Sequence, residues 1–269
     1  MSFLGTRKAQ SVGGSSLVIT LPKKWVKDRK ITRGTTLNFS LEKDGSLNIS
    51  DSSQPISDDL IKTIQADSIN DTSTLFRLLL SAYLMGYTFI CVKYSKQIPS
   101  MHREMISEFS QMVIGPEIIR EDERMIILKD ILDPKEMPFH DILKRMEVLV
   151  KSMHHEAISL CNNKDVRRYS ELMKSDKSID RLYWLCSHKY HLMKKLPSKA
   201  HKMDCTLDEA FFSVLIGKNI ERIADHSLLI ADAAMMDTSG VRLFCDKVIS
   251  FSEIVMNLFS KINFHPLLF

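Results

Sequence analysis

The sequence predicts a multidomain α+β protein with three parts in chain order. These are a small β domain at residues 1–52, a small α/β domain at 55–135 and a C-terminal antiparallel helical bundle at 138–269. Three patterns support this division: early strand-like alternation, a middle stretch that mixes helical and strand patterns, and a sustained helical period afterwards. Hydrophobic residues make up 44% and charged residues 26% of the chain, as in soluble globular proteins.

Residues 17–50 predict a compact β unit. A first strand is predicted for LVITL, and Pro22 then ends it and suits the first turn of a short helix. Alternating apolar residues in TLNFSLE, with Leu37 and Phe39 pointing inward, predict a second strand, KDGS is a hairpin signal, and LNIS predicts the returning strand. Because this unit has few large apolar residues, we expect it to be stable only as a dimer.

Positive charge is concentrated in the same unit. Residues 1–50 contain nine Lys and Arg against three Asp and Glu, a net charge of +6. The whole chain carries +4, so the remainder carries −2. A basic module on a nearly neutral body predicts a polyanionic partner, and ordinary surface solubility is the alternative.

Residues 15–50 resemble a SpoVT/AbrB-type, swapped-hairpin DNA-binding domain. The matching stretches are LPKK, ITRGTTL and the Asp44-Gly45 turn. The resemblance implies that two chains interleave their hairpins and present basic residues to DNA. It nominates as DNA contacts Arg7, Lys8, Lys23 and Lys24.

The polar stretch at 50–59 predicts a linker to the α/β domain. Beyond it the patterns predict a capped helix at 71–86, a strand at 87–95, a helix at 99–113 and a strand pair within 115–132. This stretch contains neither a Gly-rich phosphate loop nor an acid–base pair. We therefore expect a structural or dimerising spacer, with small-molecule sensing as the alternative.

From residue 139 onward the apolar residues keep a helical period. Helices are predicted at about 139–161, 164–196, 207–235 and 241–262. Short connections between long amphipathic helices make neighbours antiparallel, so these helices predict a bundle.

Two acidic pairs stand on consecutive helices of this bundle. They are Asp176 with Asp180 and Glu221 with Asp225. Like charges at i, i+4 destabilise a helix by a few tenths of a kcal/mol, so we expect compensation. Arg181 and Arg222 are candidates for ordinary ion pairs, and a cation shared between the two helices is the alternative.

Residues 138–236 resemble the PhoU family, above all in the strings DKSIDRLYWL and NIERIADHSLLIAD. Members regulate phosphate uptake and bind multinuclear metal clusters through E/D-x-x-x-D carboxylates. The resemblance implies divalent or iron ions at Asp176, Asp180, Glu221 and Asp225. The family usually has two three-helix repeats, whereas this sequence predicts one repeat and one further helix.

The sequence therefore predicts a cytoplasmic, homodimeric, DNA-binding transcriptional regulator linked to phosphate homeostasis. Five scattered cysteines without a CxxC pair indicate a reducing compartment, and no apolar run reaches a membrane-spanning length. The alternative is a metal-binding adaptor that modulates a phosphate transporter or signalling kinase, with the β unit only dimerising it. A metal-dependent enzyme is a third hypothesis, but the sequence shows no Ser/His/Asp or Cys/His arrangement, so we do not expect an enzyme.

Overall fold

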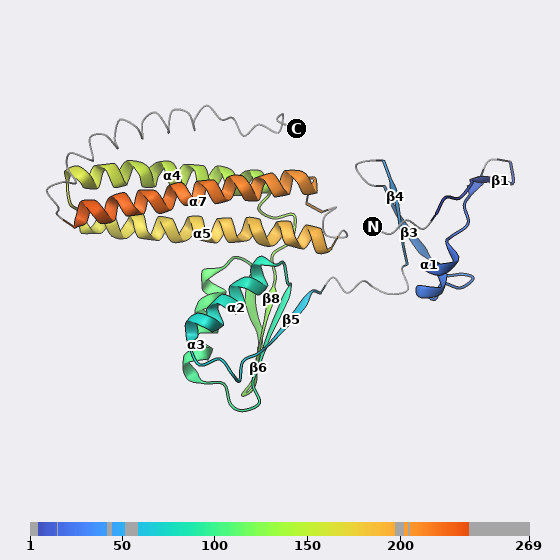
Figure 1. The fold of residues 1–269 in the computed structure, drawn as a ribbon, viewed down its shortest axis with the longest axis horizontal. Helices are drawn as coiled ribbons and strands as arrows, with labels where there is room; N and C mark the ends of the chain where they lie inside the picture. The colour runs from blue at the N-terminus through green and yellow to red at the C-terminus, as the bar shows by residue number, and fades with distance from the viewer. Residues whose placement is uncertain are drawn as a thin grey trace. The chain divides into compact units, whose positions relative to one another are not determined.

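A computed structural model describes residues 5–14, 16–41, 45–51, 59–196, 202–203 and 205–236 (Figure 1). The chain divides into two compact units, Met1–Ser57 and Asp58–Phe269, which are described separately below. Small sheets, a mixed α/β sheet and long helices follow one another along the chain, which confirms the predicted α+β class. The helix predicted at 241–262 and most of the predicted linker lie outside the described residues.

The N-terminal unit consists of two small antiparallel sheets and one short helix. Its elements are β1 (Gln10–Val12), β2 (Ser16–Val18), α1 (Lys23–Asp28), β3 (Leu37–Leu41) and β4 (Leu47–Asp51). β1 pairs with β2, and β3 forms the predicted hairpin with β4. Gly45, the glycine of the predicted KDGS turn, has a φ of +80°, a value that favours glycine. The strand β1 was not predicted, because its residues are mostly small and polar.

No described side chain of this unit is buried. Leu17 is 75% exposed and Phe39 is 61% exposed. The prediction that Phe39 faces inward is therefore not met within one chain, because two-stranded sheets of this size have no second layer to cover them.

The α/β domain is a four-stranded mixed sheet with two helices. Its elements are β5 (Ile61–Gln65), α2 (Thr72–Leu84), β6 (Phe89–Lys93), α3 (Ser100–Met112), β7 (Pro116–Glu121) and β8 (Met125–Asp130). The strand order is β5-β6-β8-β7, with β5 parallel to β6 and the other pairs antiparallel. As predicted, α2 begins after an N-cap, because Asp71 accepts a hydrogen bond from the Thr74 backbone N–H at 2.7 Å.

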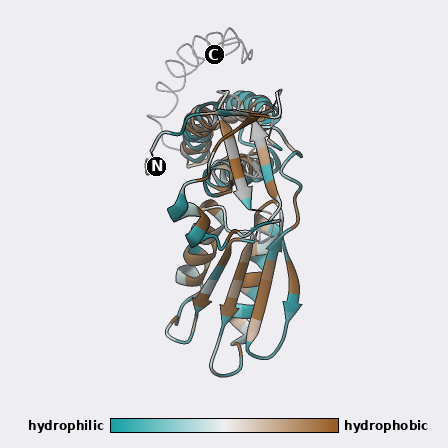
Figure 2. Ribbon diagram, turned by 90° about the vertical axis from the view of Figure 1, so that its right-hand side faces the viewer, coloured by the Kyte–Doolittle hydropathy of each residue, from teal (hydrophilic) through white to brown (hydrophobic). Residues whose placement is uncertain are grey.

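Both helices lie on the same face of this sheet (Figure 1). The core between the two layers joins strand residues such as Ile90 and Ile126 to Leu79 of α2 and Phe109 of α3. Apolar segments recur along the strands, as this burial requires (Figure 2). The strand β5 was not predicted, because in IKTIQ only Ile64 is buried and the apolar alternation is weak.

The helical bundle contains α4 (Phe139–Asn162), α5 (Val166–Lys195) and α7 (Leu207–Met235), which run antiparallel to their chain neighbours (Figure 1). The stripe predicted on α4 is buried, including Met146 and Val150 at 0% exposure. Among the helices that the structure describes, none combines the length and apolar composition needed to cross a bilayer. The α/β domain and the bundle belong to the same compact unit, and the three-domain limits given above remain a prediction.

Candidate functional site

The acidic pairs of α5 and α7 lie close enough to one another to interact electrostatically. Burial raises the pKa of Asp176, and the charges of Asp225 and Glu221 raise it further. Burial also raises the pKa of Asp180 to about 7, with added contributions from the charges of Asp176, Glu221 and Asp225. The two pairs therefore interact electrostatically between the helices, as their i, i+4 spacing predicts.

Lys218 supplies a cation at one end of this acidic face. Its ammonium donates to both carboxylate oxygens of Glu221, at 2.7 and 2.6 Å, and lies 5.2 Å from the centre of the Tyr183 ring. Burial lowers the pKa of Lys218, but the hydrogen bond and charge of Glu221 outweigh it and the pKa is raised. The Lys218 charge also offsets part of the rise in the pKa of Asp180. Lys218 therefore supplies to Glu221 a compensating charge for which Arg181, Arg222 and a shared cation were the predicted candidates.

The other end of the face carries a further acid, Asp232. Its charge contributes to the raised pKa of Asp176, and its Oδ1 accepts a hydrogen bond from the Tyr169 hydroxyl at 2.6 Å. Neither Lys218 nor Asp232 was predicted. Their spacing could have found both, because Lys218 lies three residues before Glu221 and Asp232 lies seven after Asp225 on the same helix.

The oxygen donors of this face are of the type that hard cations prefer. Within the described residues, however, no group of three or more His, Cys, Asp or Glu side chains is placed to hold a metal ion. The arrangement therefore does not fit a preformed metal centre, and the ammonium of Lys218 bonds to one of the four proposed ligands. Binding of divalent or iron ions at these carboxylates remains a proposal.

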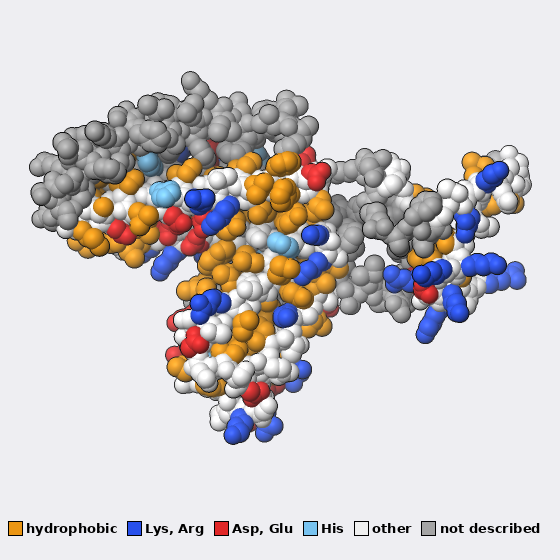
Figure 3. Space-filling view, in the orientation of Figure 1, with side chains coloured by type: hydrophobic (Ala, Val, Ile, Leu, Met, Phe, Trp, Pro, Cys, Tyr) orange, Lys and Arg blue, Asp and Glu red, His pale blue; other side chains and the backbone are white. Residues whose placement is uncertain are grey.

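The predicted DNA contacts lie in the N-terminal unit. Arg7 and Lys8 precede β1, and Lys23 and Lys24 form the first turn of α1; all four side chains are exposed. The Arg7 guanidinium donates to the Thr6 carbonyl at 2.8 Å. Lys and Arg side chains gather over this unit in Figure 3. Because the two compact units are not placed relative to each other, these residues form a candidate surface of the N-terminal unit alone.

That surface includes a shallow hollow beside α1. Its apolar lining comes from Leu21, Val26 and Ile31, and Lys23 and Lys27 also border it. An apolar hollow with a basic border suits either a protein segment or an anionic partner.

Together the bundle and its paired carboxylates define a helical domain with an acidic interhelical face. The PhoU domain family model matches residues 143–234, which run from α4 to the end of α7 and include the whole acidic face. No curated protein and no solved structure shows a significant match to the chain. The matched range does not include the N-terminal unit, so its likeness to SpoVT/AbrB domains remains a prediction.

Proposed function

We propose that the protein is a DNA-binding transcriptional regulator of phosphate homeostasis. The match of residues 143–234 to the PhoU domain supports the link to phosphate, because PhoU-like proteins regulate phosphate uptake. DNA binding is supported by the charge of the N-terminal unit. Its nine basic and three acidic residues within positions 1–50 give a net charge of +6, and the described basic side chains are exposed.

The N-terminal unit pairs with a second copy in this proposal. The carrying observation is that the unit leaves its apolar side chains uncovered: Leu17, Ile19, Phe39 and Leu47 are each more than half exposed. A unit whose described side chains form no buried core gains most of its stability by association. Dimerisation also doubles the positive field and gives it two-fold symmetry, which suits a DNA duplex.

The test is DNA binding by the full chain at a series of salt concentrations, measured by fluorescence anisotropy. Phosphate contacts give a slope of about −0.9 in log affinity against log salt per contact. Lys23→Ala combined with Lys24→Ala should flatten this slope. The matched control is Lys93→Ala with Lys96→Ala, which removes two exposed lysines from the α/β domain.

Sedimentation of the same samples tests the dimer. A monomer at micromolar concentration would contradict the pairing, and a dimer without salt-sensitive binding to any duplex would contradict DNA recognition. The second outcome favours the alternative function, an adaptor that contacts a phosphate transporter or signalling kinase through the bundle. The acidic interhelical face is the observation that supports this alternative, because it remains available when the β unit only dimerises the chain.

A further inference from the structure

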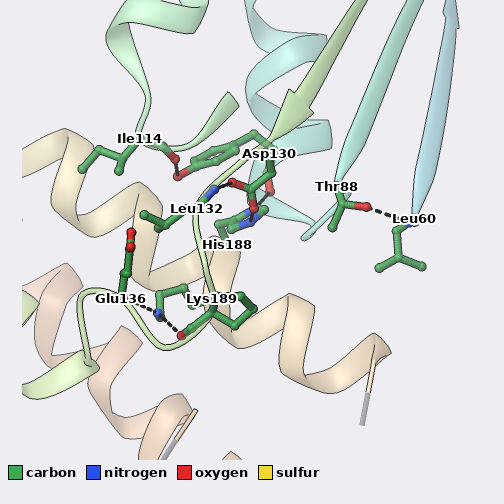
Figure 4. A network of polar contacts seen from close by, with 10 residues as sticks. Leu60, Thr88, Ile114, Asp130, Leu132, Glu136, His188 and Lys189 are labelled. Carbon is green, nitrogen blue, oxygen red and sulfur yellow. Dashed lines mark hydrogen bonds and ion pairs between the residues drawn. The ribbon is translucent and has the colours of Figure 1, made fainter. Parts of the chain in front are cut away.

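The α/β domain meets the bundle at a buried histidine. His188 of α5 is 1% exposed, and its ring lies between two acceptors of the α/β domain. Nδ1 lies 2.7 Å from the carbonyl oxygen of Tyr83, near the end of α2, and Nε2 lies 2.8 Å from Oδ2 of Asp130, the last residue of β8 (Figure 4).

The number of protons on this ring follows from its two neighbours. A carbonyl oxygen only accepts hydrogen bonds, so Nδ1 must donate to Tyr83. The other Asp130 oxygen, Oδ1, accepts the Leu132 backbone N–H at 3.1 Å, so Oδ2 is the oxygen that faces the ring. Because Nδ1 is the donor to Tyr83, the contact between Nε2 and Oδ2 needs a proton of its own: with the proton on Nε2 the pair is an imidazolium and a carboxylate, and with it on Oδ2 the pair is a neutral imidazole and a carboxylic acid.

We propose that His188 is held as an imidazolium paired with Asp130, and that this buried ion pair fastens the α/β domain to the bundle. The pair is a proton-dependent fastener, because loss of the shared proton leaves a ring lone pair facing the lone pairs of Tyr83 or Asp130. A buried acceptor opposed by another acceptor costs about 1–3 kcal/mol. This inference does not rest on the proposed DNA binding or on a metal ion.

Two further features favour a positive charge at this place. The Tyr83 carbonyl lies at the C-terminal end of α2, where the partial negative charge of the helix stabilises cations. The Tyr83 ring also stacks on the His188 ring, with centroids 4.4 Å apart and planes 8° from parallel, which suits a cation over an aromatic face.

The other titratable groups near the junction are the Tyr83 hydroxyl of α2, Asp133 in the segment between β8 and α4, and three side chains of α5. Arg181 and Cys186 interact electrostatically with Tyr83, and Lys189 follows His188 directly. The Lys189 ammonium is occupied, because it donates to the carbonyls of Pro134 at 2.9 Å and Glu136 at 2.8 Å (Figure 4). Lys189 therefore forms a second polar attachment, to the segment between β8 and α4, while its charge also interacts with those of Asp130 and Asp133.

Close backbone packing holds the acceptors in place. Gly86 has a φ of +73°, and a Cβ there would lie 2.6 Å from the Leu192 backbone nitrogen of α5. Gly115 has a φ of +107°, and a Cβ there would collide with the Asp130 carboxylate. Since glycine alone suits both positions, the junction leaves His188 little room to turn away from its acceptors.

The experiment is ¹⁵N NMR of the histidine rings in the full chain at pH 7.5, where an exposed histidine is mostly neutral. The His188 signals are identified by their loss in His188→Gln. We expect both nitrogens of this one ring to have shifts typical of N–H. A ring with one protonated and one unprotonated nitrogen would overturn the proposal. The result is read from the wild-type protein, and His188→Gln is needed only to assign the signals.

Asp130→Asn gives the independent arm. An asparagine amide can donate to Nε2, so the ring should become neutral in this variant while its two hydrogen bonds are kept. In this variant, the rate of backbone amide hydrogen exchange at the end of α2 and in β8 should follow the intrinsic pH effect alone. In the wild-type chain, exchange there should accelerate by about tenfold beyond the intrinsic pH effect as the pair loses its proton, since 1.4 kcal/mol is a factor of ten.

The matched control is His226→Gln, which changes an exposed histidine of α7. It should leave the His188 ring signals and the exchange of β8 unchanged. If Asp130→Asn leaves the ring doubly protonated, or if exchange at the junction is the same in both proteins at every pH, the ion pair does not fasten the two domains.

Discussion

Replacing Asp180 by asparagine should stabilise the protein at alkaline pH. Burial raises the pKa of this carboxyl from its ordinary 3.8 to about 7, with the neighbouring acids adding to the effect. Because the folded protein binds the proton more tightly than the unfolded chain, ionisation of Asp180 opposes folding. The contribution of Asp180 to stability is therefore most favourable below about pH 4, is lost as the pH rises toward 7 and is constant above it. Asparagine cannot ionise, so the variant does not lose this stability.

The size of the effect follows from the same two pKa values. Their difference corresponds to about 4 kcal/mol at 1.36 kcal/mol per pH unit. The side chain is only partly buried, and solvent screening lowers this figure to about 1–2 kcal/mol. For a folded unit of this size, 1 kcal/mol shifts the melting temperature by about 2–4 °C. We expect Asp180→Asn to melt about 2–8 °C higher than the wild type at pH 8.

The assay is thermal unfolding followed by circular dichroism at pH 8 and pH 5, in the presence of a chelator. The gain should shrink at pH 5, where the wild-type carboxyl is largely protonated. The control is Glu171→Gln, which removes an exposed carboxylate from the same helix and should have little effect at either pH. An equal gain at both pH values, or no gain at pH 8, would refute the assignment of repulsion and burial to Asp180.

Three further outcomes are expected in the same melting assay. Lys218→Met should destabilise the protein by about 1 kcal/mol at pH 8, because Glu221 loses its ion pair, whereas Lys218→Arg should restore most of the loss. Gly86→Ala should cost about 2 kcal/mol or more, because its φ is +73° and its Cβ would meet Leu192; wild-type stability would refute the close packing of α2 on α5. In chelator-free buffer, the proposal that a hard cation binds the acidic face requires added Mn²⁺ or Mg²⁺ to raise the melting temperature of the wild type and not of Asp180→Asn with Asp225→Asn, and an unchanged wild type would refute it.

Much of the fold could be predicted where local patterns and burial agree. The stripe of α4 is apolar at helical spacing and is buried as expected, and Asp71 marks the start of α2. The strands β1 and β5 were missed because each has few apolar residues. The exposure of Phe39 could not be foreseen from alternation, since alternation shows that side chains share a face and not whether anything covers it.

The acidic face could be predicted for the same reason, because i, i+4 spacing fixes a shared helix face regardless of the rest of the chain. Its cation could have been found by extending the same spacing to Lys218. The contact between His188 and Asp130 had no such signal. The two residues are 58 positions apart, and their meeting depends on how the sheet docks on the bundle.

The helix α5 carries both sites, and their responses to pH combine. Asp180 and His188 are eight residues apart, which places them about 12 Å apart along the helix axis. A rising pH charges Asp180 against its acidic neighbours. In the proposed ion pair, loss of the proton between His188 and Asp130 would weaken a second contact of the same helix. Sites separated by more than about 10 Å normally contribute additively to the free energy of unfolding. If Asp180→Asn and Asp130→Asn change this free energy additively at pH 8, the two sites act independently. A deviation larger than about 0.5 kcal/mol would instead show that α5 transmits the charge state of the acidic face to the α/β domain.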